Sequence, residues 1–188
     1  AMGTAFSSDG IHWNQVNPLA IPKIGDISHA TWEPRRNRYI ILARDFYLPE
    51  DVHEKFKHQE WYRKIFWGRA VRLYESEDFN HWEARDIVMH ADMEDLPGDE
   101  IYSMAVFPYE GQYLGLVQIY HAYPGNNTVD IQLAVSRDCL QWKRLGNRQT
   151  FITLGDIGQW DRFNNSVASA PVILEDEIRF YYSGRAYR

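Results

Sequence analysis

Short apolar runs alternate with polar turns along most of the chain. Residues 27–34 form one such run, and a polar turn separates it from the apolar run 39–43. Residues 101–117 repeat this arrangement, with the same spacing of five from proline to tyrosine, and residues 166–182 repeat it without the proline. Short apolar runs bounded by turns are typical of strands in an antiparallel meander. The pattern therefore predicts an all-β fold.

A second pattern lies between these runs and repeats three times. Each copy has serine, then aspartate two residues later, then tryptophan four residues after the aspartate. The serine and aspartate side chains can bond the backbone of a tight turn, while the tryptophan opens the next strand and packs between layers. The copies are residues 7–13, 76–82 and 136–142.

The two patterns together predict units of four antiparallel strands, as in the blades of a β-propeller. Each unit contains an inner strand, a second strand, a third strand, the serine-aspartate-tryptophan turn and an outer strand. The expected units are the outer strands of a split blade at 4–20, a blade at 26–90, a blade at 100–150, and the inner strands of a split blade at 164–184. Residues 50–67, inside a long insertion at 46–69, can contain a helix.

About three blades are too few to close an ordinary propeller. Two interpretations remain open at this point. Either the 188 residues are part of a longer propeller chain, or two copies form a homodimer that closes six blades without bare strand edges. We expect the homodimer for the sequence as given.

Composition and charge exclude several classes of partner. The net charge is −6, and no basic run that could neutralise a nucleic acid backbone is present. No apolar run approaches the roughly 20 residues that span a bilayer, so no membrane partner is expected. Cys139 is the single cysteine, which rules out an internal disulfide and, with the lack of a recognisable signal peptide, slightly favours the cytoplasm.

Candidate functional residues follow from strand connectivity. In an up-and-down blade, the start of the inner strand and the end of the second strand lie on the same face. Aligning the repeats puts Asp26, Glu100 and Asn165 at equivalent positions that open the three inner strands. The predicted substrate-binding residues around them are His29, Arg44, Asp45, Asp99, Tyr102, His121, Trp160, Asn164 and Asn165. Carboxylates can bond sugar hydroxyls and aromatic faces can pack on sugar rings, so the predicted ligand is a carbohydrate.

At this point the chain resembles the five-bladed propeller glycoside hydrolases of families 43, 32 and 68. The resemblance is carried by residues 7–13, 99–102 and 159–161, besides the repeat plan. It implies a glycosidase in which Asp26 is base or nucleophile, Glu100 is the general acid and Asp161 is a supporting carboxylate. The family 32 signature motifs are absent, and one equivalent position is Asn165, which cannot ionise. A non-catalytic propeller that binds carbohydrate or protein, and a truncated propeller with an incomplete site, are the alternatives.

No metal or cofactor is predicted. The seven histidines lack metal-ligand spacing. The acidic run 92–95 raises calcium as an alternative, but it lacks the alternating order of an EF-hand loop, so a solvated loop is the preferred interpretation.

Overall fold

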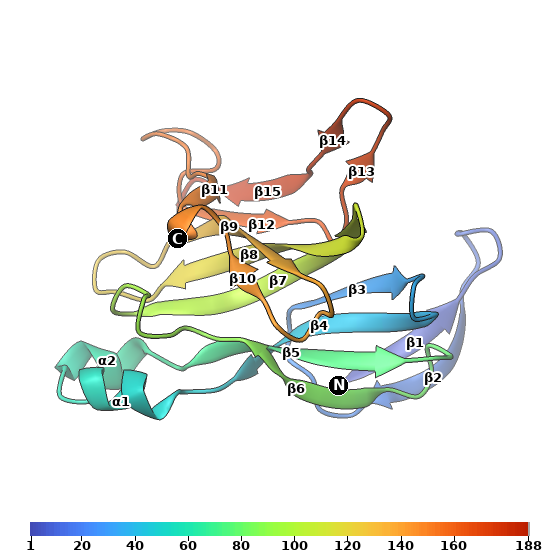
Figure 1. The fold of residues 1–188 in the computed structure, drawn as a ribbon, viewed down its shortest axis with the longest axis horizontal. Coiled ribbons are helices and arrows are strands. Elements are labelled where there is room, and N and C mark those ends of the chain that lie inside the picture. Colours follow the sequence, from blue (N-terminus) through green and yellow to red (C-terminus); the bar gives the residue numbers. More distant parts are fainter. Residues whose placement is uncertain (188) are drawn as a thin grey trace.

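The computed structural model describes residues 1–187, without the side chain of Arg63. Strands dominate it, and they form consecutive antiparallel sheets along an arc (Figure 1). The prediction of an all-β fold is therefore confirmed. No helix among the described residues has the length and apolar character needed to cross a membrane.

The chain begins with a hairpin of β1 (Met2–Phe6) and β2 (Asn14–Ile21). A four-stranded sheet follows, which we call the first blade. Its strands are β3 (Ser28–Glu33), β4 (Arg38–Phe46), β5 (Arg69–Ser76) and β6 (Glu83–Met89), paired antiparallel in chain order. Between β4 and β5 lie two short helices, α1 (Glu50–Phe56) and α2 (Glu60–Ile65).

The second blade is built from β7 (Asp99–Tyr109), β8 (Gln112–His121) and β9 (Val129–Ser136). Two short strands, β10 (Lys143–Arg144) and β11 (Thr150–Ile152), share its outer edge. The 3-10 turn Gly146–Arg148 separates them, with Asn147 and Arg148 both at positive φ. The outer strand is thus broken because the backbone leaves the extended conformation there.

The chain ends in a second hairpin, the C-terminal hairpin. It pairs β12 (Asn164–Val167) with β15 (Tyr182–Arg185), and β13 (Val172–Ile173) with β14 (Ile178–Arg179). β12 also pairs parallel with β9 through Asn164 and Val129.

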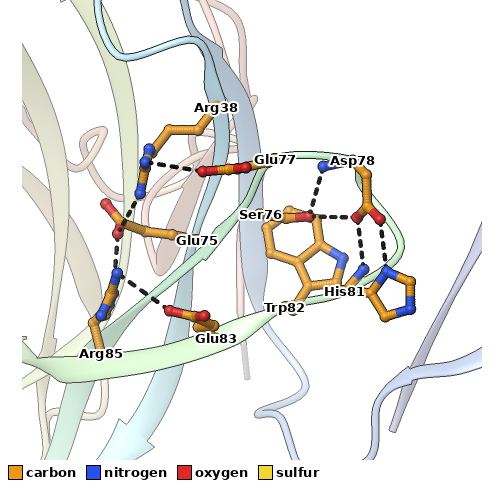
Figure 2. Close-up of a pocket in the computed structure, with 9 residues that line it drawn as sticks. All are labelled: Arg38, Glu75, Ser76, Glu77, Asp78, His81, Trp82, Glu83 and Arg85. Atoms are coloured by element: carbon orange, nitrogen blue, oxygen red, sulfur yellow. Dashed lines mark hydrogen bonds and ion pairs between the residues drawn. The ribbon is translucent and has the colours of Figure 1, made fainter.

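The three serine-aspartate-tryptophan turns have the same internal hydrogen bonds. In the first blade, the Asp78 carboxylate accepts from the backbone N–H of His81 (Figure 2). It also accepts from the backbone N–H of Asn80, and the Trp82 indole donates to the Phe79 carbonyl at 3.0 Å. The turns at 7–13 and 136–142 repeat these bonds. Each turn satisfies its own backbone and directs the chain into the next strand.

Alternating side chains of the central strands build the core between neighbouring sheets. On β4, Ile40 and Leu42 face the second blade and pack with Ile101 and Met104. Their neighbours Ile41 and Ala43 face the N-terminal hairpin and pack with Ile21. A third cluster joins the second blade to the C-terminal hairpin through Phe107, Leu116, Ile131 and Val167. Central strands buried on both faces explain the continuous apolar runs of the sequence.

The first strands of the blades run in the same direction. At one end, the Arg35 guanidinium donates to the Gly111 carbonyl at 2.7 Å, which joins the β3–β4 turn to the β7–β8 turn. At the other end, the backbone N–H of Trp67, just before β5, donates to Glu100 on β7 at 2.6 Å. β12 is parallel to β9 and hence to β7. β3, β7 and β12 therefore begin at one end of the molecule, the strand-start end, where α1 and α2 also lie (Figure 1).

Candidate functional site

Asp26 lies at the strand-start end, in the segment that leads into β3. Gly25 lets this segment approach the end of β4, because a Cβ there would lie 1.9 Å from the Arg44 carbonyl oxygen. The Arg44 guanidinium donates to the Asp26 carboxylate and lies over the Tyr102 ring, 4.8 Å from its centroid. The Asp26 side chain is 70% exposed. It is thus a carboxylate held at one oxygen and open to solvent.

Glu100 occupies the equivalent position at the start of β7, but its surroundings differ. Its side chain has no exposed surface. One oxygen accepts from the backbone N–H of Trp67, and the other accepts from the backbone and the guanidinium of Arg69 at 3.3 and 2.5 Å. Both oxygens are acceptors, so Glu100 offers no proton to a ligand in this arrangement. The geometry makes it the anchor that joins the end of the helical insertion to the second blade.

Aromatic and guanidinium groups connect these two positions. The ring centroids of Tyr102 and Tyr120 lie 5.7 Å apart, and the Arg69 guanidinium is 4.8 Å from the centroid of the Tyr120 ring. Trp67 is 63% exposed, and its ring lies 6.4 Å from that of Phe46. The structure therefore brings together Asp26, Arg44, Tyr102 and Glu100 of the predicted residues, and adds Trp67 and Arg69.

Asp45 points away from this group. Its carboxylate accepts from the Arg72 guanidinium at 2.5 Å and from the backbone N–H of Phe46 at 2.8 Å. A cavity of about 630 Å³ opens beside it, between the N-terminal hairpin and the first blade. Residues 20–25 form one wall, and Arg44, Asp45 and Arg72 supply charged groups to the other.

His121, the last residue of β8, lies between two carboxylates at the strand-start end of the second blade. Its Nδ1 lies 2.6 Å from Asp99 and its Nε2 lies 3.2 Å from Asp130, which also accepts from the Thr150 hydroxyl at 2.9 Å. Burial acts to lower the pKa of His121, but the hydrogen bonds and charges of Asp130 and Asp99 outweigh it and raise the pKa to about 10. The imidazolium therefore links β7, β8 and β9 through its contacts with the two carboxylates. Because Asp99 and His121 are bonded to each other, neither side chain is free to bind a ligand.

His29 is buried on β3 and faces the C-terminal hairpin. Its Nδ1 lies 3.3 Å from the Ser169 hydroxyl, 140 positions along the chain. Its Nε2 is buried without a hydrogen-bond partner among the described residues, and burial lowers the pKa of the imidazole below its usual range. The contact brings the inner strand of the first blade next to the chain that follows β12.

The remaining predicted residues cluster around the C-terminal hairpin. The Asn165 amide is buried and donates to the Thr153 carbonyl at 3.1 Å. Asp161 accepts from the Tyr182 hydroxyl at 2.9 Å, and Trp160 stacks on the same ring at 5.3 Å. Asn164 is held by backbone pairing to both β15 and β9. The contacts of this group hold the hairpin, and none of those found in residues 1–187 joins it to Asp26 or Glu100.

The acidic run 92–95 is bound by arginines. The Arg148 guanidinium donates to both oxygens of Asp92 at 2.7 Å, and Arg144 donates to Asp95 at 2.5 Å. Across the part of the chain that the structure describes, no group of three or more histidine, cysteine, aspartate or glutamate side chains is arranged to hold a metal ion. The acidic run lies in the linker between β6 and β7. Its ion pairs therefore join this linker to the outer edge of the second blade.

Sequence reasoning missed Arg69 and Asp130. Arg69 follows the insertion, so its approach to Glu100 depends on how residues 47–68 fold back. Asp130 meets His121 across two adjacent strands, a contact that depends on strand register. Neither residue carries a local signal.

No protein-family model matches the chain, and no curated protein sequence matches it. Solved structures share its fold. The β-1,2-mannobiose phosphorylase of Listeria innocua, in complex with β-1,2-mannobiose, has a TM-score of 0.61 at 18% identity and matches 96% of this chain. The family 32 β-fructofuranosidase of Bombyx mori, in complex with sucrose, has a TM-score of 0.61 at 14% identity and matches 99%. A family 117 glycoside hydrolase of Zobellia galactanivorans has a TM-score of 0.59 at 16% identity and matches 85%.

These likenesses show the fold alone. The chain has the propeller-like fold of glycoside hydrolases and phosphorylases. It spans 44%, 35% and 47% of the lengths of the three structures, respectively.

Proposed function

We propose that the strand-start end of this glycoside hydrolase-like fold binds carbohydrate. The observation that carries the proposal is the group formed by the exposed Asp26 carboxylate, the Arg44 guanidinium bonded to it, and Tyr102 beneath that guanidinium. The exposed Trp67 indole lies at the same end of the molecule. Charged groups that accept and donate hydrogen bonds, next to aromatic faces, suit the alternating hydroxyls and C–H faces of a sugar.

The fold supports the same ligand class without naming the sugar. Two of the similar structures are described as complexes with β-1,2-mannobiose and with sucrose. Because a fold hosts many activities, the ligand of this chain is argued from its own residues.

Glycoside hydrolysis is the second candidate, favoured by the exposed carboxylate of Asp26. The reaction needs one protonated carboxyl beside the leaving oxygen and one ionised carboxylate across the sugar ring. Asp26 fits the base or nucleophile, whereas Asp161 is bonded to Tyr182 of the C-terminal hairpin and has no contact with Asp26 among the described residues. Glu100 could act as the acid only after its release from Trp67 and Arg69. Binding without hydrolysis needs no such rearrangement, so we favour it.

Binding is tested by calorimetry with oligosaccharides of mannose, fructose, arabinose and xylose, and hydrolysis with the chromogenic glycosides of the same sugars. We expect Asp26→Asn and Trp67→Ala each to weaken binding of the best ligand about tenfold or more. Glu110→Gln, an exposed carboxyl at the opposite end of β7, is the matched control and should bind like the unmodified chain. Binding that survives both Asp26→Asn and Trp67→Ala, or no binding to any of these sugars, would reject the site.

A further inference from the structure

Trp13 differs from its two counterparts in burial, although the three turns share their hydrogen bonds. Trp13 is 63% exposed. Trp82 is half-buried and packs on the cluster that contains Ile41 of β4. Trp142 is half-buried against β8, where a Cβ on Gly115 would lie 2.9 Å from its ring. In both blades the tryptophan thus covers the second strand of its own blade, and Trp13 has no such strand beneath it in the described chain.

The N-terminal hairpin corresponds to the outer half of a blade. β1 ends at the same turn motif as β5 and β9, the third strands of the two blades. β5 pairs with β4 and β6, and β9 pairs with β8 and the outer strands. Within residues 1–187, β1 pairs with β2 alone. The edge of β1 that should meet a second strand is therefore open.

The C-terminal hairpin corresponds to an inner half. β12 takes the place of an inner strand and β15 that of a second strand, and β15 ends the sheet order β15-β12-β9-β8-β7. Large side chains around this edge are exposed, among them Phe151, Val172, Ile173 and Tyr181. Both blades lie between the N-terminal hairpin and the C-terminal hairpin along the arc (Figure 1).

We propose that the β1 edge of one copy pairs antiparallel with the β14–β15 edge of a second copy, and that the reciprocal pairing forms a two-fold dimer. A second copy is the occupant because this chain itself carries the inner half-blade that its outer half lacks. The inference does not rest on carbohydrate binding. Open, apolar strand edges are prone to pair with other chains, and a closed two-fold arrangement leaves none of these four hairpin edges bare.

The complete blades predict the register of this pairing. Ser76 lies opposite Tyr39 in the first blade, and Ser136 lies opposite Tyr113 in the second. Ile178 takes the place of these tyrosines in the third repeat, so Ser7 lies opposite Ile178 and Phe6 opposite Arg179. The same alignment places Trp13 over Phe180 of the other copy. Phe180 already contacts Phe107 and Phe151, so Trp13 would extend an existing aromatic cluster.

The first test is the mass in solution, by light scattering over a concentration series up to the millimolar range. We expect twice 22.2 kDa for the unmodified chain. Trp13→Ala should weaken the dimer about a hundredfold, because it removes a large aromatic side chain from the centre of the interface. Trp67→Ala is the matched control, since Trp67 is equally exposed at 63%, and should leave the dimer intact. A monomer throughout the series, or a dimer unaffected by Trp13→Ala, overturns the proposal.

The second test is a disulfide across the predicted register. The double variant Phe6→Cys with Arg179→Cys should form an intermolecular disulfide under mild oxidation, since facing residues in paired strands lie within disulfide reach. Phe6→Cys with Ser183→Cys, four residues out of register, is the control and should cross-link at least tenfold more slowly. The native Cys139 does not interfere, because it is buried and burial raises the pKa of its thiol to about 12. Equal cross-linking in both variants, or none in the first, contradicts this pairing.

Discussion

His121 shows how one residue can hold three strands. Its imidazolium sits between Asp99 on β7 and Asp130 on β9, and all three side chains are largely buried. Replacing it with glutamine leaves two close carboxylates without a counter-charge. We expect His121→Gln to lower the free energy of unfolding by about 3 kcal/mol at pH 6, measured by urea denaturation.

The same residue predicts a dependence on pH. Its pKa is about 10 in the folded chain, against an ordinary value of 6.5. A raised pKa stabilises the fold fully below the unfolded value, and the contribution is lost as the pH rises through the folded one. The stability gap between the unmodified chain and His121→Gln should therefore shrink between pH 6.5 and pH 10. His58→Gln, which changes an exposed histidine, is the control. A stability difference between the unmodified chain and His121→Gln that stays constant with pH would contradict the charged contact of His121 with Asp99 and Asp130.

Asp26 and Glu100 have equivalent positions in the repeat alignment, but neutralising them should change stability by very different amounts. Glu100→Gln leaves the Arg69 guanidinium without its carboxylate in a buried setting, so we expect a loss of about 3 kcal/mol in unfolding free energy. Asp26→Asn should change stability by less than about 0.5 kcal/mol, because the Asp26 side chain is mostly exposed. Equal small effects in thermal or urea unfolding would show that Glu100 is not the anchor of the insertion.

This contrast marks the limit of sequence reasoning at the residue scale. Repeat alignment predicted equivalent positions for Asp26, Glu100 and Asn165, because the repeat spacing sets which positions are expected to open an inner strand. It could not distinguish an exposed carboxylate from one sealed by the insertion, because the partners of Glu100 come from more than thirty positions away. Burial and hydrogen bonding at such sites depend on tertiary contacts.

At the scale of elements, the insertion between β4 and β5 and the strand β5 that follows it provide a matched pair of tyrosines. The Tyr62 hydroxyl is buried on α2 with no partner in the described residues, whereas the Tyr74 hydroxyl donates to the Lys23 carbonyl at 3.2 Å. Removing an unpaired buried hydroxyl relieves its desolvation cost. We expect Tyr62→Phe to raise the free energy of unfolding by up to about 1 kcal/mol and Tyr74→Phe to lower it by about 1 kcal/mol. Chemical denaturation measures the unfolding free energy of both variants. If Tyr62→Phe destabilised the chain more than Tyr74→Phe, the Tyr62 hydroxyl would have a hydrogen-bond partner, which contradicts the prediction.

Strands were more predictable than the outer edge of the second blade. Apolar runs revealed β4, β7 and β8 because these strands are covered by neighbours on both faces. The outer edge is split into β10 and β11 because residues 147–148 adopt a left-handed conformation. The amino-acid composition of this segment does not predict that conformation. The parallel contact of β12 with β9 was also missed, because it joins two units instead of two strands of one unit.

At the scale of the whole molecule, neighbouring sheets pack against one another through core clusters, and stability is distributed unevenly along the arc. β8 is paired on both sides by β7 and β9 and lies within two core clusters. β1 is paired on one side, and most of the side chains of β2 are exposed. Backbone amides in well-covered strands exchange only through large-scale unfolding, while those at open edges exchange through local fraying.

Hydrogen exchange can therefore report both the fold and its assembly. We expect β8 amides to exchange roughly 10³-fold or more slowly than unprotected amides at every concentration, because their exchange requires unfolding of the second blade. The β1 amides that do not bond β2 should be fast in dilute solution and become protected as the concentration rises, since pairing with β14–β15 of a second copy follows mass action. Trp13→Ala should shift that protection to higher concentration while leaving β8 unchanged. Protection of β1 that is independent of concentration would mean that its edge is covered within one chain, which contradicts the pairing of two copies.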